Sequence, residues 1–89
     1  MTVYVISYEL RKEWKNYLPL TIFLRTFTHC RDHATCWFID TPISASDLRA
    51  KIELYLDGDD TIFVGPLAKG WAGSNVACGD WLNDPARNW

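Results

Sequence analysis

The sequence predicts an α+β domain built on a four-stranded antiparallel sheet, and three observations support that prediction. The stretches 2–9 and 35–40 carry bulky β-branched or aromatic residues on both faces of the pleat, as central strands do. The stretches 16–28 and 44–57 carry apolar residues at helical spacing instead. The elements follow one another as β-α-β-β-α-β, the ferredoxin-like order, which places both helices on one face of the sheet.

Composition limits the chain to one small domain. Its 89 residues are 48% hydrophobic, enough for one core, and we expect a single domain over 1–89 with a core at 2–66 and a tail at 67–89. A formal charge of -2 provides no overall positive field to attract nucleic acid. Residues 1–30 carry neither a secretion signal nor an apolar run of about 18 residues, so we expect a cytoplasmic protein without membrane contact.

The first strand, 2–9, is the element on which the other elements are expected to pack. Its apolar run ends at Glu9, directly before a basic stretch, so the end of this strand is the first place to look for a chemical site. Apolar side chains alternate along it, with Tyr4, Ile6 and Tyr8 on one face and Val3 and Val5 on the other.

The first helix and the hairpin follow this strand. Asn16 fits a helix N-cap with Pro19 in the first turn, and the helix should run to about Phe27 or Thr28. Its buried stripe is Leu20, Leu24 and Phe27, with Ile22 off that stripe and exposed. We then expect a short strand near 29–32, a turn at His33-Ala34 and a central strand at 35–40, in which Trp37 and Ile39 oppose Cys36 and Phe38.

The second helix has the clearest start signal. Ser44-Ala45-Ser46-Asp47 is a capping box, and Gly58 is suited to the C′ position after the helix. The final strand should cover 61–65 and stop at Pro66. The buried helix face is expected to comprise Leu48, Ile52, Tyr55 and Leu56.

Two helices leave the other face of the sheet open, although the strands are apolar there too. The simplest cover is the same face of a second copy, so we expect a two-fold homodimer. The Trp-rich tail at 67–89 should form a short helical turn near 80–83 that packs on this face or on the partner. Its large apolar residues are Trp71, Trp81, Leu82 and Trp89.

Three cysteines, Cys30, Cys36 and Cys78, are an odd number in a chain without an export signal, so free thiols are expected rather than a disulfide. His29, Cys30, His33 and Cys36 are zinc-ligand types, but they lack the paired spacing of a zinc knuckle. We interpret them as hairpin residues.

The sequence resembles one family over about residues 3–82. The segments that carry the resemblance are V-Y-V-I-S-Y-E-L, N-Y-L-P-L, L-R-T-F, T-C-W-F-I-D-T, S-A-S-D-L, D-D-T-I-F-V, W-A-G and W-L. They are similar to the bacterial and phage SinR-like family, which is related to the second core CRISPR-associated adaptation protein and to the VapD ribonucleases.

The resemblance implies a ferredoxin-like homodimer in which the ends of the two first strands approach across the two-fold axis. In the CRISPR-associated relatives, a Tyr-Asp pair stands there, and the Asp of each subunit has been proposed to hold a divalent metal for phosphodiester cleavage. Some members act instead as dimeric scaffolds that hold duplex DNA. The matching pair here is Tyr8-Glu9, in which Glu keeps the carboxylate but reaches one methylene further.

Glu9 is therefore the candidate catalytic residue and the candidate ligand for Mg²⁺ or Mn²⁺, because these ions are held by one or two carboxylates together with water and phosphate. One Glu makes a weak site, but a two-fold axis would supply a second. The plainer interpretation is a solvated residue beside Arg11 and Lys12.

The basic cluster after Glu9 is the candidate nucleic-acid interface. Arg11, Lys12 and Lys15 surround Trp14, and such a mixture of cations and an aromatic ring suits phosphates and bases. The plainer interpretation is again a solvated loop. The leading hypothesis is a dimeric nucleic-acid-binding protein with possible metal-dependent nuclease activity. The alternative is a non-catalytic dimeric interaction or scaffold module.

Overall fold

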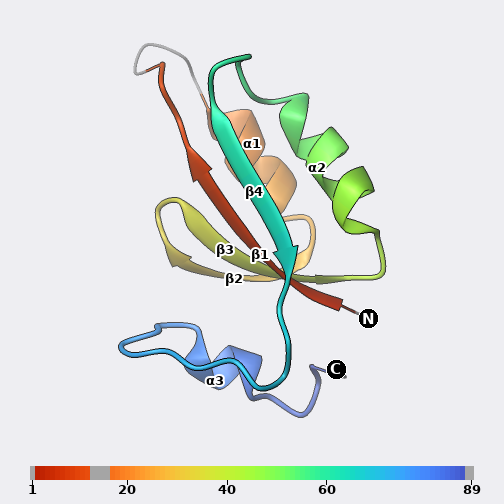
Figure 1. Cartoon of the computed structure of the whole chain (residues 1–89), viewed down its shortest axis with the longest axis vertical. Helices are drawn as coiled ribbons and strands as arrows, with labels where there is room; N and C mark the ends of the chain where they lie inside the picture. Colours follow the sequence, from red (N-terminus) through yellow and green to blue (C-terminus); the bar gives the residue numbers. More distant parts are fainter. Residues whose placement is uncertain (1, 13–16, 88–89) are drawn as a thin grey trace.

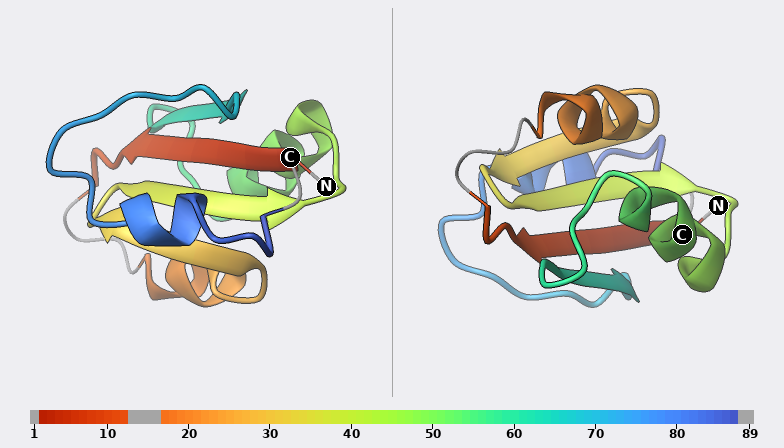
Figure 2. Two further views of the ribbon diagram at one scale, coloured as in Figure 1. Left: turned by 90° about the horizontal axis from the view of Figure 1, so that it is seen from below. Right: turned by 90° about the horizontal axis from the view of Figure 1, so that it is seen from above.

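A four-stranded antiparallel sheet forms the centre of the molecule. The computed structural model describes residues 2–12 and 17–87, and its strand order is β2-β3-β1-β4. Two helices cover one face of the sheet, and the tail with its short third helix crosses the other (Figures 1 and 2). The strands are β1 (Thr2–Glu9), β2 (Thr28–His33), β3 (Cys36–Thr41) and β4 (Thr61–Pro66), and the helices are α1 (Leu18–Leu24), α2 (Ala45–Glu53) and α3 (Gly79–Leu82).

Strand β1 uses both of its backbone edges. It pairs antiparallel with β3 on one side and with β4 on the other. The amide of Tyr8 donates to Thr35 O at 3.1 Å, and Val3 O accepts from the amide of Leu67 at 2.8 Å. Because hydrogen-bonded pairs alternate along an antiparallel ladder, the even-numbered residues of β1 bond to β3 and the odd-numbered residues bond to β4. The predicted central positions of β1 and β3 are confirmed.

The helix-side core is built from the predicted faces. Tyr4, Ile6 and Tyr8 of β1 all point toward the helices. The ring nitrogen of Trp37 donates to the hydroxyl of Tyr8 at 3.0 Å, and that hydroxyl donates to Ala34 O at 3.0 Å, so both buried polar atoms are satisfied. The other fully buried members are Leu20 and Leu24 of α1, Leu48 and Ile52 of α2, and Trp37 and Ile39 of β3.

Helix α1 is shorter than the sequence predicted. It ends at Leu24, with Arg25 as its C-cap, and does not reach Phe27. The hydroxyl of Thr26 donates to Phe23 O at 2.7 Å, a local bond that competes with helix continuation. The predicted N-cap Asn16 lies outside the described residues. Ile22 is exposed, as predicted.

Helix α2 begins as predicted, but it ends differently. The amide of Asp47 donates to the Ser44 side chain at 3.2 Å, which confirms Ser44 as the N-cap. The helix ends at Glu53 with Leu54 as its C-cap, and no glycine in the described part of the chain has a positive φ. The prediction of Gly58 as a left-handed C′ residue was therefore wrong.

The tail packs on the open face of its own sheet. Cys78 and Leu82 are fully buried there against Val3 and Phe38, with Trp71, Val76 and Trp81 packed around them. Helix α3 (Gly79–Leu82) matches the predicted helical turn near 80–83. The tail thus covers within one chain the face from which a second copy was inferred, and the homodimer stays a prediction.

A disulfide joins Cys30 of β2 to Cys78, next to α3. The prediction of three free thiols was therefore wrong, and only Cys36 is free. Cysteine number and spacing could not reveal this pair, because the two residues are 48 positions apart and meet only once the tail has crossed the sheet. The amide of Cys78 also donates to Asp32 Oδ1 at 3.1 Å, so the joint is both covalent and hydrogen-bonded.

The end of the tail is tied to β3 as well. The guanidinium of Arg87 lies 3.6 Å from Asp40 Oδ2, with both side chains nearly buried, and it stacks 4.3 Å from the centre of the Trp81 ring. Asp40 Oδ1 and Arg87 Nε and Nη1 are buried without a hydrogen-bond partner in the described part of the chain, so this ion pair offsets only part of the cost of burying its charges.

Reduction of the disulfide should destabilise the fold strongly. Opening a loop of this length returns conformational entropy to the unfolded chain, and we expect the free energy of unfolding to fall by about 4 kcal/mol. Urea unfolding with and without dithiothreitol measures the change. A Cys30→Ala/Cys78→Ala variant is the control and should not respond to the reductant. A wild-type chain with equal stability in both conditions would contradict the prediction.

Candidate site at the end of the first strand

Glu9 is the last residue of β1, and its side chain is 67% exposed. Its Oε1 lies 3.2 Å from an NH group of Arg11, two residues further along the chain. The carboxylate therefore faces a cation of its own chain. The alternation of β1 explains the exposure, because Ser7 and Glu9 follow Val3 and Val5 onto the face opposite the helices, at the end of the strand.

The basic residues of the candidate nucleic-acid interface are also engaged. Arg11 pairs with Glu9, and Lys12 Nζ lies 3.3 Å from Asp59 Oδ2. The Arg11 side chain is 49% exposed and that of Lys12 is 36% exposed, so these pairs are weak and open to competition by another anion. The other two predicted residues of this interface, Trp14 and Lys15, lie outside the described residues.

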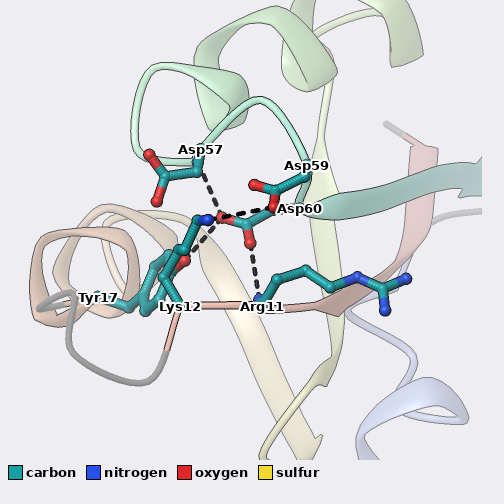
Figure 3. A network of polar contacts seen from close by, with 6 residues as sticks. All are labelled: Arg11, Lys12, Tyr17, Asp57, Asp59 and Asp60. Carbon is teal, nitrogen blue, oxygen red and sulfur yellow. Dashed lines mark hydrogen bonds and ion pairs between the residues drawn. The ribbon is translucent and has the colours of Figure 1, made fainter.

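Asp60 accepts hydrogen bonds from three different segments near the end of β1 (Figure 3). Its Oδ1 accepts the amide of Arg11 at 2.8 Å, and its Oδ2 accepts the hydroxyl of Tyr17 and the amide of Asp57, each at 2.8 Å. One carboxylate thus joins the end of β1, the start of α1 and the turn between α2 and β4. Asp60 was not among the site residues predicted from the sequence.

The phenol of Tyr17 responds to this carboxylate. Desolvation by burial raises the pKa of Tyr17 from 10.0 to about 12, and the hydrogen bond to Asp60 and its negative charge act in the same direction. The folded state thus favours the protonated, neutral phenol. This makes Tyr17 a structural hydrogen-bond donor and a poor general base at neutral pH.

A shallow pocket of about 280 Å³ lies beside Asp60, below the turn that joins α2 to β4. Its lining residues include three carboxylates and no basic side chain, so it does not suit phosphate. The lining residues are Glu53, Leu56, Asp57, Gly58, Asp60 and Ile62.

The described residues of one chain do not assemble a divalent-metal site at Glu9. No three His, Cys, Asp or Glu side chains gather as potential ligands anywhere in ranges 2–12 and 17–87. The guanidinium beside Glu9 opposes a second positive charge at that carboxylate. These residues therefore do not fit Mg²⁺ or Mn²⁺, and a metal shared by two Glu9 residues stays a prediction.

Two of the His and Cys residues of the hairpin make other contacts. Cys30 is in the disulfide, and His29 Nδ1 lies 2.8 Å from Phe27 O. Burial raises the pKa of the Cys36 thiol, and the negative charge of Asp32 raises it further. The thiol is held in its protonated, less reactive form.

Comparisons with protein-family models, with curated proteins and with solved structures found no match for this chain. The resemblance to the SinR-like family stays a prediction. None of the helices in the described part of the chain combines the length and apolar character that a membrane crossing requires.

Asp60→Asn tests the network around Tyr17. Removal of the negative charge should lower the pKa of Tyr17 from about 12 toward 10.0, as measured by absorbance or NMR titration of the phenol. Because the folded state raises this pKa, the protonated phenol stabilises the fold below pH 10, and this stabilisation is lost as the pH rises toward 12. The free energy of unfolding should therefore fall more for the wild type than for the variant over this pH range. Asp47→Asn, on α2, is the control and should leave the Tyr17 titration unchanged.

Proposed function

We propose that this chain is a ferredoxin-like domain that acts as a dimeric scaffold and has no hydrolytic chemistry of its own. The fold assignment is supported by the strand order β2-β3-β1-β4, with α1 and α2 on one face. This is the arrangement that the β-α-β-β-α-β order produces when the two helical connections cross on the same side.

The observation that carries the scaffold role is the set of large apolar side chains left in water. Among the described residues, which already form two well-packed cores, four large apolar side chains are exposed by more than half. Residues four apart on a helix are neighbours, so Leu18 and Ile22 form one apolar strip on α1. Such surface favours contact with another protein chain. The exposed fractions are 56% for Leu18, 55% for Ile22, 83% for Leu54 and 58% for Phe63.

The surroundings of Glu9 support a role without hydrolysis. The carboxylate is paired with Arg11, and no group of three potential metal ligands occurs among residues 2–12 and 17–87. A shared site between two chains would also need the sheet faces or strand ends to approach each other, and the tail lies on that face (Figure 2). The described residues thus supply no preorganised cluster of the kind that metal-assisted cleavage of a phosphodiester requires.

Nucleic-acid binding is the second candidate function, and one observation favours it. Arg11 and Lys12 are partly exposed just after β1, in weak ion pairs whose acidic partners a phosphate can replace. The resemblance to the SinR-like family points the same way. The nearby side chains of Asp57, Asp59 and Asp60 oppose it, because they repel a phosphate backbone.

The scaffold proposal predicts a dimer without nuclease activity. Sedimentation equilibrium at micromolar concentrations should give twice the mass of one chain. Incubation with single- and double-stranded RNA and DNA in Mg²⁺ or Mn²⁺ should give equal, background cleavage for wild type and Glu9→Ala. A monomer would contradict the scaffold role, and metal-dependent cleavage that Glu9→Ala abolishes would establish the nuclease instead.

Nucleic-acid binding has its own test. If it occurs at this site, Arg11→Gln/Lys12→Gln should weaken the affinity at least tenfold and reduce its salt dependence by about two phosphate contacts. Fluorescence anisotropy with a labelled oligonucleotide measures both quantities. Arg49→Gln/Lys51→Gln on α2 removes the same charge elsewhere and should leave the affinity nearly unchanged. Equal losses in both variants would mean non-specific attraction.

A further inference from the structure

The two edges of the sheet differ in how they are protected against pairing with another strand. Strand β2 carries Arg31 and Asp32, and its register with β3 shifts between Arg31 and His33. Charges and a bulge are the usual devices that prevent edge-to-edge association. Strand β4, with the sequence T-I-F-V-G-P, has no charged residue, and its register with β1 is unbroken. The one such device on β4 is Pro66, its last residue, so β4 is the less protected edge.

The register shows which backbone groups of β4 face outward. Val3 O accepts from the Leu67 amide, so Val5 and Ser7 form hydrogen-bonded pairs with Gly65 and Phe63 in the same ladder. The N–H and C=O groups of the intervening residues, Ile62 and Val64, consequently point away from β1. In the described part of the chain, no backbone hydrogen bond from another segment reaches them.

Two further residues fit an open edge. Pro66 falls on the outward-facing set, and a proline is tolerated there because the missing N–H would face away from the sheet. Phe63 is 58% exposed on the face opposite the helices and is not part of the cluster that the tail buries. Its ring lies over Gly65, where an added Cβ would come within 2.8 Å of it.

We propose that β4 pairs with β4 of a second copy of this chain, antiparallel, with the two-fold axis at Phe63. This inference rests on the proposed scaffold function and names its interface. The symmetric register places Ile62 opposite Val64 of the second copy, and Val64 opposite Ile62. These are the residues whose groups face outward, so each pair exchanges two hydrogen bonds. The two sheets become one continuous sheet of eight strands.

The same register places Phe63 opposite Phe63 of the second copy. This position is a non-hydrogen-bonded pair, in which the Cα atoms approach to about 4.5 Å and aromatic side chains contact each other. The contact would bury the apolar ring that one chain leaves in water. A second copy suits this edge better than a charged peptide does, because the six residues of β4 offer no charge to select one.

The edge pairing and a metal shared by two Glu9 residues exclude each other. Glu9 pairs with Thr61, two residues from the axis, and β1 lies one strand further from it than β4. With strands about 4.8 Å apart and a rise of about 3.4 Å per residue, the two Glu9 Cα atoms would be about 20 Å apart. Side chains at that separation cannot ligate one ion.

Phe63→Lys tests the interface by placing two like charges at the axis. We expect the dimer dissociation constant to rise at least tenfold in sedimentation equilibrium. Ala50→Lys introduces the same charge at an exposed position of α2 that has no part in the proposed surfaces, and it should leave the dimer intact. Circular dichroism checks that each variant folds. A dimer that Phe63→Lys does not weaken overturns the β4 assignment and leaves the scaffold function standing, whereas a monomeric wild type removes both.

A cysteine at the axis gives a second test that does not depend on the lysine variant folding. In a Cys36→Ser background, Phe63→Cys should form an intermolecular disulfide under mild oxidation, because opposed Cα atoms lie within the range that a disulfide spans. Thr61→Cys in the same background is the control, since it lies away from the axis and should cross-link much less. Equal cross-linking of the two variants, or none, overturns the register.

Discussion

The structure depends on β1 being bonded along both edges and buried on both faces. Successive residues of β1 form backbone hydrogen bonds alternately to β3 on one edge and to β4 on the other. Its side chains alternate between the two hydrophobic cores. The need to bond both edges and to bury both faces of β1 determines where the neighbouring strands, the helices and the tail lie. The helices must cover Ile6 and its companions on one face, and something apolar must cover Val3 and Val5 on the other.

Sequence patterns predicted much of this arrangement because the alternation along β1 and β3 and the capping box at Ser44 are local signals. The end of α1 was missed because the Thr26 hydroxyl bond is a detail of geometry. The disulfide was missed because it depends on the path of the tail. The apolar pattern of the strands correctly predicted that the second face of the sheet is covered. Periodicity does not show which segment covers it, because that depends on the tertiary path of the chain.

The candidate site, too, was predicted from the sequence only in part. The position of Glu9 at a strand end could be read from the sequence, since the apolar run stops there. Its pairing with Arg11, and that of Lys12 with Asp59, could not, because exposed ion pairs are chosen by side-chain reach rather than by spacing. The role of Asp60 could not be read either, because its carboxylate joins the end of β1, the start of α1 and the turn before β4, which meet only in the folded chain.

The irregular register between Arg31 and His33 has a consequence for the size of any assembly. A chain with two open edges would add copies without limit, since each added copy would present a fresh edge and the product would be a fibre. A chain with only one open edge cannot add a further copy in this way once that edge has paired with another chain. If copies associate through β4 as proposed, the bulge in β2 would leave no second edge for strand addition, and the assembly would stop at two chains.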